Sequence, residues 1–126
     1  MFAGCPNLTK ISNILPAMEL AEYCYSYMFA AYFSSGNISI SSGLKIAPEL
    51  PANILAPYCY ANMFEGCEDL NKIPFILPAT ELRDHCYANM FEQCINITRA
   101  PILPATTLVS SCYYNMFSGC SKLNYI

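Results

Sequence analysis

The chain repeats itself, and this repeat limits its possible folds more than any other feature. The tripeptide Leu-Pro-Ala begins four units, at Leu15, Leu50, Leu77 and Leu103. In each unit a Cys-Tyr pair starts nine residues after that leucine, and a Met-Phe pair starts four residues after the cysteine. The units begin 35, 27 and 26 residues apart. Such agreement at fixed offsets is typical of an architecture in which similar units stack on one another.

We interpret the 126 residues as one domain built from these units. The first full unit is longer by about eight residues, which fall near Phe33 to Ile40. The sequence starts and stops inside a unit, and neither end carries a polar cap. We therefore hypothesise that the chain is a fragment of a longer protein, or that a partner covers its ends. The units are a partial unit 1–14 followed by 15–49, 50–76, 77–102 and 103–126.

The opening pentapeptide, Met1–Cys5, has the look of a lipobox, the acylation motif of bacterial lipoproteins. A lipobox follows a basic segment and an apolar segment, and neither precedes it in this sequence. Related pentapeptides recur at Met63–Cys67, Met90–Cys94 and Met116–Cys120. The repeat therefore explains these residues better than a membrane anchor does.

The first half of each unit has the apolar spacing of a helix. In unit 77–102, Pro78 suits the first turn of a helix, where its missing N–H costs no hydrogen bond. Leu82, Cys86 and Met90 then follow at i, i+4 and i+8 and would share one helical face. Sister units carry a glycine, such as Gly119, where the helix should stop in a left-handed conformation.

The second half of each unit is a short apolar stretch, which we predict to be a strand. Proline closes three of the stretches, and a proline at the end of a strand removes no central hydrogen bond. A strand and a helix in about 26 residues fall in the leucine-rich-repeat range. The predicted fold class is an α/β repeat, a leucine-rich-repeat solenoid with a short parallel strand ladder on one face and helices on the other. The predicted strands are Leu8–Ile11, Leu44–Pro48, Leu70–Pro74, Ile97–Pro101 and Leu123–Ile126.

The segments MFEGCEDLNKIPFILPA and MFSGCSKLNYI resemble the BspA-like class of bacterial leucine-rich repeats. The shared pattern is an aromatic-x-Gly-Cys-x-x-Leu turn that leads into each strand. This chain departs from that class in its Leu-Pro-Ala tripeptides, in its Cys-Tyr pairs, and at Tyr32, which takes a cysteine position. The resemblance implies a curved solenoid in a surface-exposed or secreted bacterial protein that binds other macromolecules without catalysis. It therefore implies an extracellular or cell-surface location.

Eight cysteines fall into two columns of the repeat. Free cysteine behaves as a small buried hydrophobe, so we expect mostly reduced thiols packed in ladders. Two cysteines of one helix, such as Cys86 and Cys94, would lie about 12 Å apart, beyond disulfide reach. Some disulfides between units, or a metal site, remain alternatives, although no tight metal-binding cluster occurs. The columns are Cys24, Cys59, Cys86 and Cys112, and Cys5, Cys67, Cys94 and Cys120.

The pair His85-Cys86 is the one catalytic candidate, and the repeat argues against it. Adjacent residues of a helix do not face each other, and sister units carry Tyr58 and Ser111 at the histidine position. We interpret His85 as a solvent-facing helix residue. The sequence has no recognised catalytic or phosphate-binding motif. We therefore predict no enzyme activity, no cofactor and no metal.

The composition restricts the kinds of partner that the chain can have. The net charge of −3 does not favour nucleic acid. Although 55% of the residues are hydrophobic, no run approaches the roughly 18 apolar residues that a membrane span needs. The apolar excess must therefore go into a core or an interface.

Five of the six basic residues fall in or beside the predicted strands, whereas Arg83 and most acidic residues fall on the helical half. Repeat proteins commonly bind through such extended faces, and insertions often lie on the binding face. We predict a module that binds a protein or a carbohydrate-bearing macromolecule of acidic character. The alternative is a structural subunit of a larger assembly, a surface appendage or phage particle, with end-to-end self-association or a neighbouring subunit. The predicted binding residues are Lys10, Lys45, Lys72, Arg99, Ser35 and Asn37.

Overall fold

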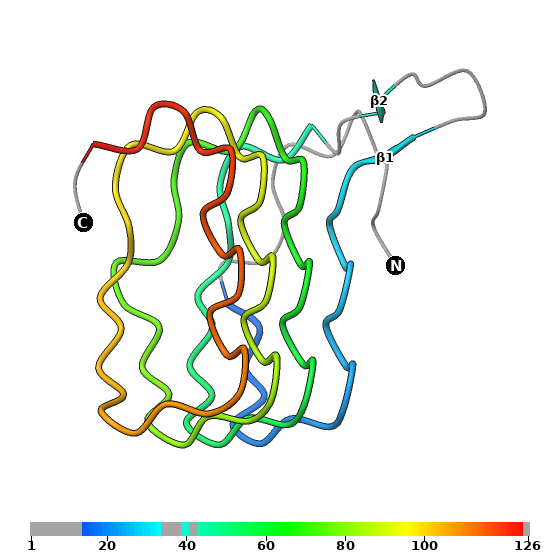
Figure 1. Cartoon of the computed structure of the whole chain (residues 1–126). Coiled ribbons are helices and arrows are strands. Elements are labelled where there is room, and N and C mark those ends of the chain that lie inside the picture. The colour runs from blue at the N-terminus through cyan, green and yellow to red at the C-terminus, as the bar shows by residue number, and fades with distance from the viewer. Residues whose placement is uncertain (1–13, 34–38, 41–42, 125–126) are drawn as a thin grey trace.

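The chain folds into a stack of coils, one coil per repeat unit (Figure 1). The structure, a computed structural model, describes residues 14–33, 39–40 and 43–124. Each coil runs up one side of the stack as a zigzag of turns and returns along the other side as an extended segment. We call these the turn side and the extended side. The turn side comprises 23–31, 58–66, 85–93 and 111–119, and the extended side comprises 14–20, 44–55, 70–82 and 97–108.

The described residues contain no helix, and their only strands are β1 (Tyr32–Phe33) and β2 (Ser39–Ile40). These strands pair antiparallel, with Tyr32 opposite Ile40 and Phe33 opposite Ser39. They form the stem of the insertion in the first full unit (Figure 1). The predicted α/β solenoid with helices on one face is therefore wrong.

The predicted strand ladder is also wrong. Within the described residues, the extended segments pair only through isolated parallel bridges, such as Ile46 with Lys72 and Ile76 with Ile102. The prolines that close these segments donate no hydrogen bond, so each contact between neighbours stays short. The predicted strand Leu8–Ile11 lies outside the described residues, as do the last two residues of the chain.

Hydrogen bonding on the turn side alternates along the chain. The amide of Tyr87 donates to the carbonyl of Cys112 in the next unit at 3.0 Å, whereas the amide of Ala88 donates back to His85 in its own unit at 3.1 Å. Alternate residues thus join units, and the residues between them close turns within a unit. Five such bonds cross each junction, from Tyr23, Tyr25, Tyr27, Phe29 and Ala31; from Tyr58, Tyr60, Asn62, Phe64 and Gly66; and from His85, Tyr87, Asn89, Phe91 and Gln93.

Every fourth residue of the turn side is left-handed in the last three units, and so are Tyr23 and Tyr27 in the first. In unit 77–102 these residues are His85, Asn89 and Gln93, with φ of 56°, 57° and 60°. Each is the third residue of a turn, the position that requires a positive φ in one of the common turn types. Gly66 and Gly119 have the predicted left-handed conformation, at 72° and 74°, but they belong to this turn series and end no helix.

This period explains why the helix prediction fails. A helix advances 100° per residue, so residues four apart drift by about 40° at each step. The turn series repeats every four residues without that drift, and it places Cys86 and Met90 on the inner face, where both are buried. Leu82, four residues before Cys86 on the adjoining extended segment, is buried as well. Apolar residues at i, i+4 and i+8 therefore fit both structures.

Columns of identical side chains fill the core between the two sides. The rings of Phe64 and Phe91 are fully buried and stack with centroids 5.5 Å apart. Tyr60 and Tyr87 stack at 5.6 Å in the same way. The predicted core positions Phe64, Phe91, Leu82 and Met90 are confirmed. Phe117 is only partly buried, because its unit has another unit on one face only.

Six of the seven described cysteines are buried, and none of the seven forms a disulfide. Burial raises the pKa of the Cys86 thiol to about 11. In the second column the Sγ of Cys94 donates to the carbonyl oxygen of Phe64 in the preceding unit, at 3.0 Å. Buried thiols are thus confirmed at these six positions. The prediction is wrong for Cys24, which is exposed, and Cys5 lies outside the described residues.

Candidate binding groove

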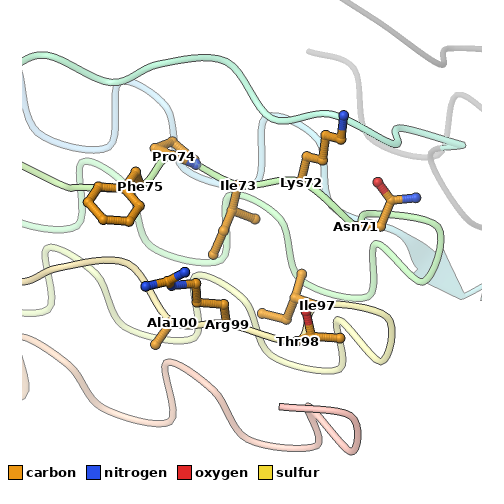
Figure 2. Close-up of a pocket in the computed structure, with 9 residues that line it drawn as sticks. All are labelled: Asn71, Lys72, Ile73, Pro74, Phe75, Ile97, Thr98, Arg99 and Ala100. Carbon is orange, nitrogen blue, oxygen red and sulfur yellow. The ribbon is translucent and has the colours of Figure 1, made fainter. Parts of the chain in front are cut away.

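A groove of about 280 Å³ opens on the extended side, between units 50–76 and 77–102 (Figure 2). Its lining comes from two neighbouring extended segments, so the stacking of the units creates it. The floor is apolar and the rim carries cationic and polar groups. The lining residues are Asn71, Lys72, Ile73, Pro74, Phe75, Ile97, Thr98, Arg99 and Ala100.

Phe75 shapes one end of the groove because it is an extra residue in its unit. Leu70 and Leu77 are seven positions apart, whereas Ile97 and Leu103, the equivalent residues of the next unit, are six apart. The additional residue leaves the Phe75 side chain 60% exposed. The guanidinium carbon of Arg99 lies 5.2 Å from the centre of this ring. Such cation–π contacts contribute about 0.5–1 kcal/mol at exposed sites and hold the guanidinium in place.

Lys72 and Arg99 occupy equivalent positions of neighbouring units, each two residues after the buried Leu70 or Ile97. Both side chains are exposed. Figure 2 shows the guanidinium of Arg99 turned toward Phe75, while the ammonium of Lys72 points away from it. The two cations thus flank the apolar floor and face different directions. This arrangement suits an extended ligand with several anionic groups better than one compact anion.

The other predicted binding residues divide into two sets. Lys45 is exposed and neighbours the groove, because its carbonyl accepts the amides of Asn71 and Lys72 at 3.0 and 3.2 Å. Its side chain does not line the groove. Lys10, Ser35 and Asn37 lie outside the described residues.

Sequence reasoning missed Phe75, Asn71 and Thr98 as groove residues. The charge pattern singled out Lys72 and Arg99, but polar and aromatic neighbours become visible only when two units are aligned. The one-residue excess between Leu70 and Leu77 was the available signal for Phe75.

His85 is not the solvent-facing helix residue that the sequence predicted. Its ring is half-buried and stacks on Tyr58 with centroids 4.7 Å apart. Its Nδ1 is buried and has no hydrogen-bond partner in the described part of the chain. Tyr23 stacks on the other face of Tyr58 at 4.8 Å, so His85 continues an aromatic column. Its place in this column, between Tyr58 and Ser111, follows from the repeat.

Among the described residues, no group of three His, Cys, Asp or Glu side chains is arranged to hold a metal ion. Within the same residues, no helix is long and apolar enough to cross a membrane.

Comparisons of the chain with family models, with curated proteins and with solved structures find no match. The BspA-like resemblance therefore stays a prediction.

Proposed function

We propose that this chain is a non-catalytic module that binds an acidic or carbohydrate-bearing macromolecule at a bacterial surface. The observation that carries the proposal is the groove in which Lys72 and Arg99 of neighbouring units flank an apolar floor that ends at the exposed Phe75. The bacterial-surface location rests on the BspA-like resemblance of the Gly-Cys turns alone.

The chemistry of the groove favours a ligand that is long and anionic. Neighbouring parallel segments lie about 4.8 Å apart. Two cations on adjacent units can therefore contact successive anionic groups of one polymeric ligand. The exposed ring of Phe75 offers an apolar surface for a sugar ring or an aliphatic segment. The net charge of −3 gives no long-range attraction for an anion, so recognition would depend on these local contacts.

Charge reversal tests this proposal. The probes are polyglutamate and a sulfated polysaccharide, titrated into the whole chain by calorimetry. We expect the double variant Lys72→Glu with Arg99→Glu to bind at least about tenfold more weakly, which is about 1.4 kcal/mol. Arg83→Glu is the control, and it matches the single variant Arg99→Glu in its change of net charge: Arg83 is exposed, carries the same charge and lies outside this groove.

Two outcomes would contradict the proposal. One is that the unaltered chain binds neither probe. The other is that the double variant and the Arg83→Glu control bind equally well. Single reversals of Lys10 and Lys45, and deletion of residues 33–40, extend the same test to the remaining predicted binding residues.

The second candidate is a structural subunit of a larger assembly. Unit 103–126 favours it, because the outer edge of its turn side presents backbone amides that the earlier units use to bind a neighbouring unit. In that case the interactions between copies, and not the groove, would be the main function.

A further inference from the structure

The groove on the extended side has two chemically different ends. Phe75 forms one end, and Asn71 and Thr98 lie at the other (Figure 2). Four extended residues separate Asn71 from Phe75, a distance of about 13 Å. The guanidinium of Arg99 turns toward the aromatic end, whereas the ammonium of Lys72 points away from it. None of the nine described residues that line the groove is acidic. A ligand that fills it therefore meets an aromatic ring, two separated cations and two neutral polar groups.

The polar end of the groove favours a ligand with hydroxyl groups. Asn71 and Thr98 occupy equivalent positions of neighbouring units, each one residue after the buried Leu70 or Ile97. Both are exposed. A side-chain amide and a hydroxyl each donate and accept hydrogen bonds. A sugar hydroxyl can take either role opposite them, whereas an ionised acidic side chain can only accept.

The aromatic end favours the flat apolar face of a sugar ring. Phe75 is 60% exposed, and the guanidinium carbon of Arg99 lies 5.2 Å from the centre of its ring. A sugar ring presents C–H groups on one face, and these pack on an exposed aromatic surface as other apolar groups do. The guanidinium beside the ring offers planar donors to an acidic group on the same sugar.

An acidic peptide fits the groove less well than a polysaccharide does. Peptides that bind along extended segments commonly add as a strand to an open edge. Both groove segments already have a neighbouring coil on their outer side. The amide of Lys72 donates to the carbonyl of Lys45 at 3.2 Å, on one side of the groove. The amide of Asn124 donates to the carbonyl of Thr98 at 3.1 Å, on the other side. Pro74 within the groove also lacks an N–H with which to bind a peptide backbone.

We propose that the ligand of this groove is an anionic polysaccharide, with one sugar ring packed on Phe75 and acidic groups paired with Arg99 and Lys72. This inference rests on the proposed function and names the class of its ligand. Because the two ends of the groove lie about 13 Å apart, the ligand spans more than one sugar residue. The hydroxyl groups of a sugar at the polar end bond to Asn71 and Thr98.

Three polymers of similar length separate the sugar from the charge. Polygalacturonate carries a carboxylate on every sugar. Its methyl ester keeps the sugars and loses the charge, and polyglutamate keeps the charge without sugars. Each polymer is titrated into the whole chain by calorimetry. We expect polygalacturonate to bind at least about tenfold more tightly than either of the other two.

Variants of Phe75 test the aromatic end. We expect Phe75→Ala to weaken the binding of polygalacturonate by at least about fivefold, as removal of an aromatic anchor from a binding site does. Phe75→Tyr should retain the binding, because it keeps the ring. The control is Tyr114→Ala, which should bind as the unaltered chain does: Tyr114 is also an exposed aromatic residue, but it lies on the turn side and outside the groove.

The inference is overturned if polyglutamate or the methyl ester binds as tightly as polygalacturonate. It is also overturned if Phe75→Ala weakens the binding of polygalacturonate and of polyglutamate equally. The comparison of the three polymers uses the unaltered chain, so it decides the inference even where a variant does not fold. Failure of the proposed function gives a different result, in which no anionic polymer binds or the double variant Lys72→Glu with Arg99→Glu binds as its control does.

Discussion

The two sides of the stack have the same number of units but very different bonding between them. On the turn side five backbone hydrogen bonds cross each junction, and stacked rings and buried thiols lie beneath them. On the extended side the segments meet through isolated bridges, and side chains such as Ile46, Phe75 and Ile102 are exposed. The turn side therefore holds the units together, and the extended side is free to vary and to carry a groove.

The comparison predicts unequal effects of removing a phenylalanine from each side. Phe91→Ala on the turn side should lower the free energy of unfolding by about 3–5 kcal/mol, because it removes a fully buried ring from a stacked column. Phe75→Ala on the extended side should change it by less than about 1 kcal/mol, because that ring is mostly exposed. Urea unfolding of both variants is the measurement. Equal losses of unfolding free energy in the two variants would mean that the two sides contribute equally to the stability of the stack, which would contradict the comparison.

Alkaline pH should lower the free energy of unfolding of the chain through the buried thiols of the turn side. Burial raises the pKa of Cys86 to about 11 and that of Cys59 to about 12, against an ordinary value of 9.0. Above pH 9 the unfolded chain loses these protons while the folded chain keeps them, so the stability present below pH 9 falls as the pH rises. The loss is about 1.4 kcal/mol per pH unit for each such thiol, and ends near the folded pKa.

Unfolding free energies measured between pH 8 and pH 11 test this dependence. Cys86→Ala removes one of the titrating thiols and should make the decline shallower by about the contribution of one group. A stability that stays constant from pH 8 to pH 10.5 would show that these thiols are accessible to ionisation in the folded chain.

The two sides also differ in how far the sequence predicts them. The repeat spacing places equivalent residues of neighbouring units together, and the columns of Phe64 with Phe91 and of Tyr60 with Tyr87 confirm this. The helix was wrong because the apolar spacing fits a four-residue turn series equally well. Asn62 and Gly66 lie four residues apart and tolerate left-handed backbone best, so they were the available signal. Tyr58 and Gln93 concealed it, because such side chains rarely adopt that conformation.

On the extended side, the charge pattern identified Lys72 and Arg99, which the structure places on one groove. Whether they bind a ligand stays a prediction. The contact of Arg99 with Phe75 could not be predicted, because it depends on how one extra residue is accommodated between two stacked segments.

The most direct test of the four-residue turn series is to measure which of two variants is more stable, Asn89→Gly or Asn89→Ala. Asn89 has φ of 57° and its side chain donates a hydrogen bond to Glu92, which both variants remove equally. A left-handed backbone favours glycine over alanine by about 1–2 kcal/mol, whereas a helix interior favours alanine by about 1 kcal/mol. Ala88, which is buried and lacks a positive φ, is the control, and Ala88→Gly should be destabilising. We predict that Asn89→Gly unfolds at higher urea concentration than Asn89→Ala, and the reverse order would contradict the turn series.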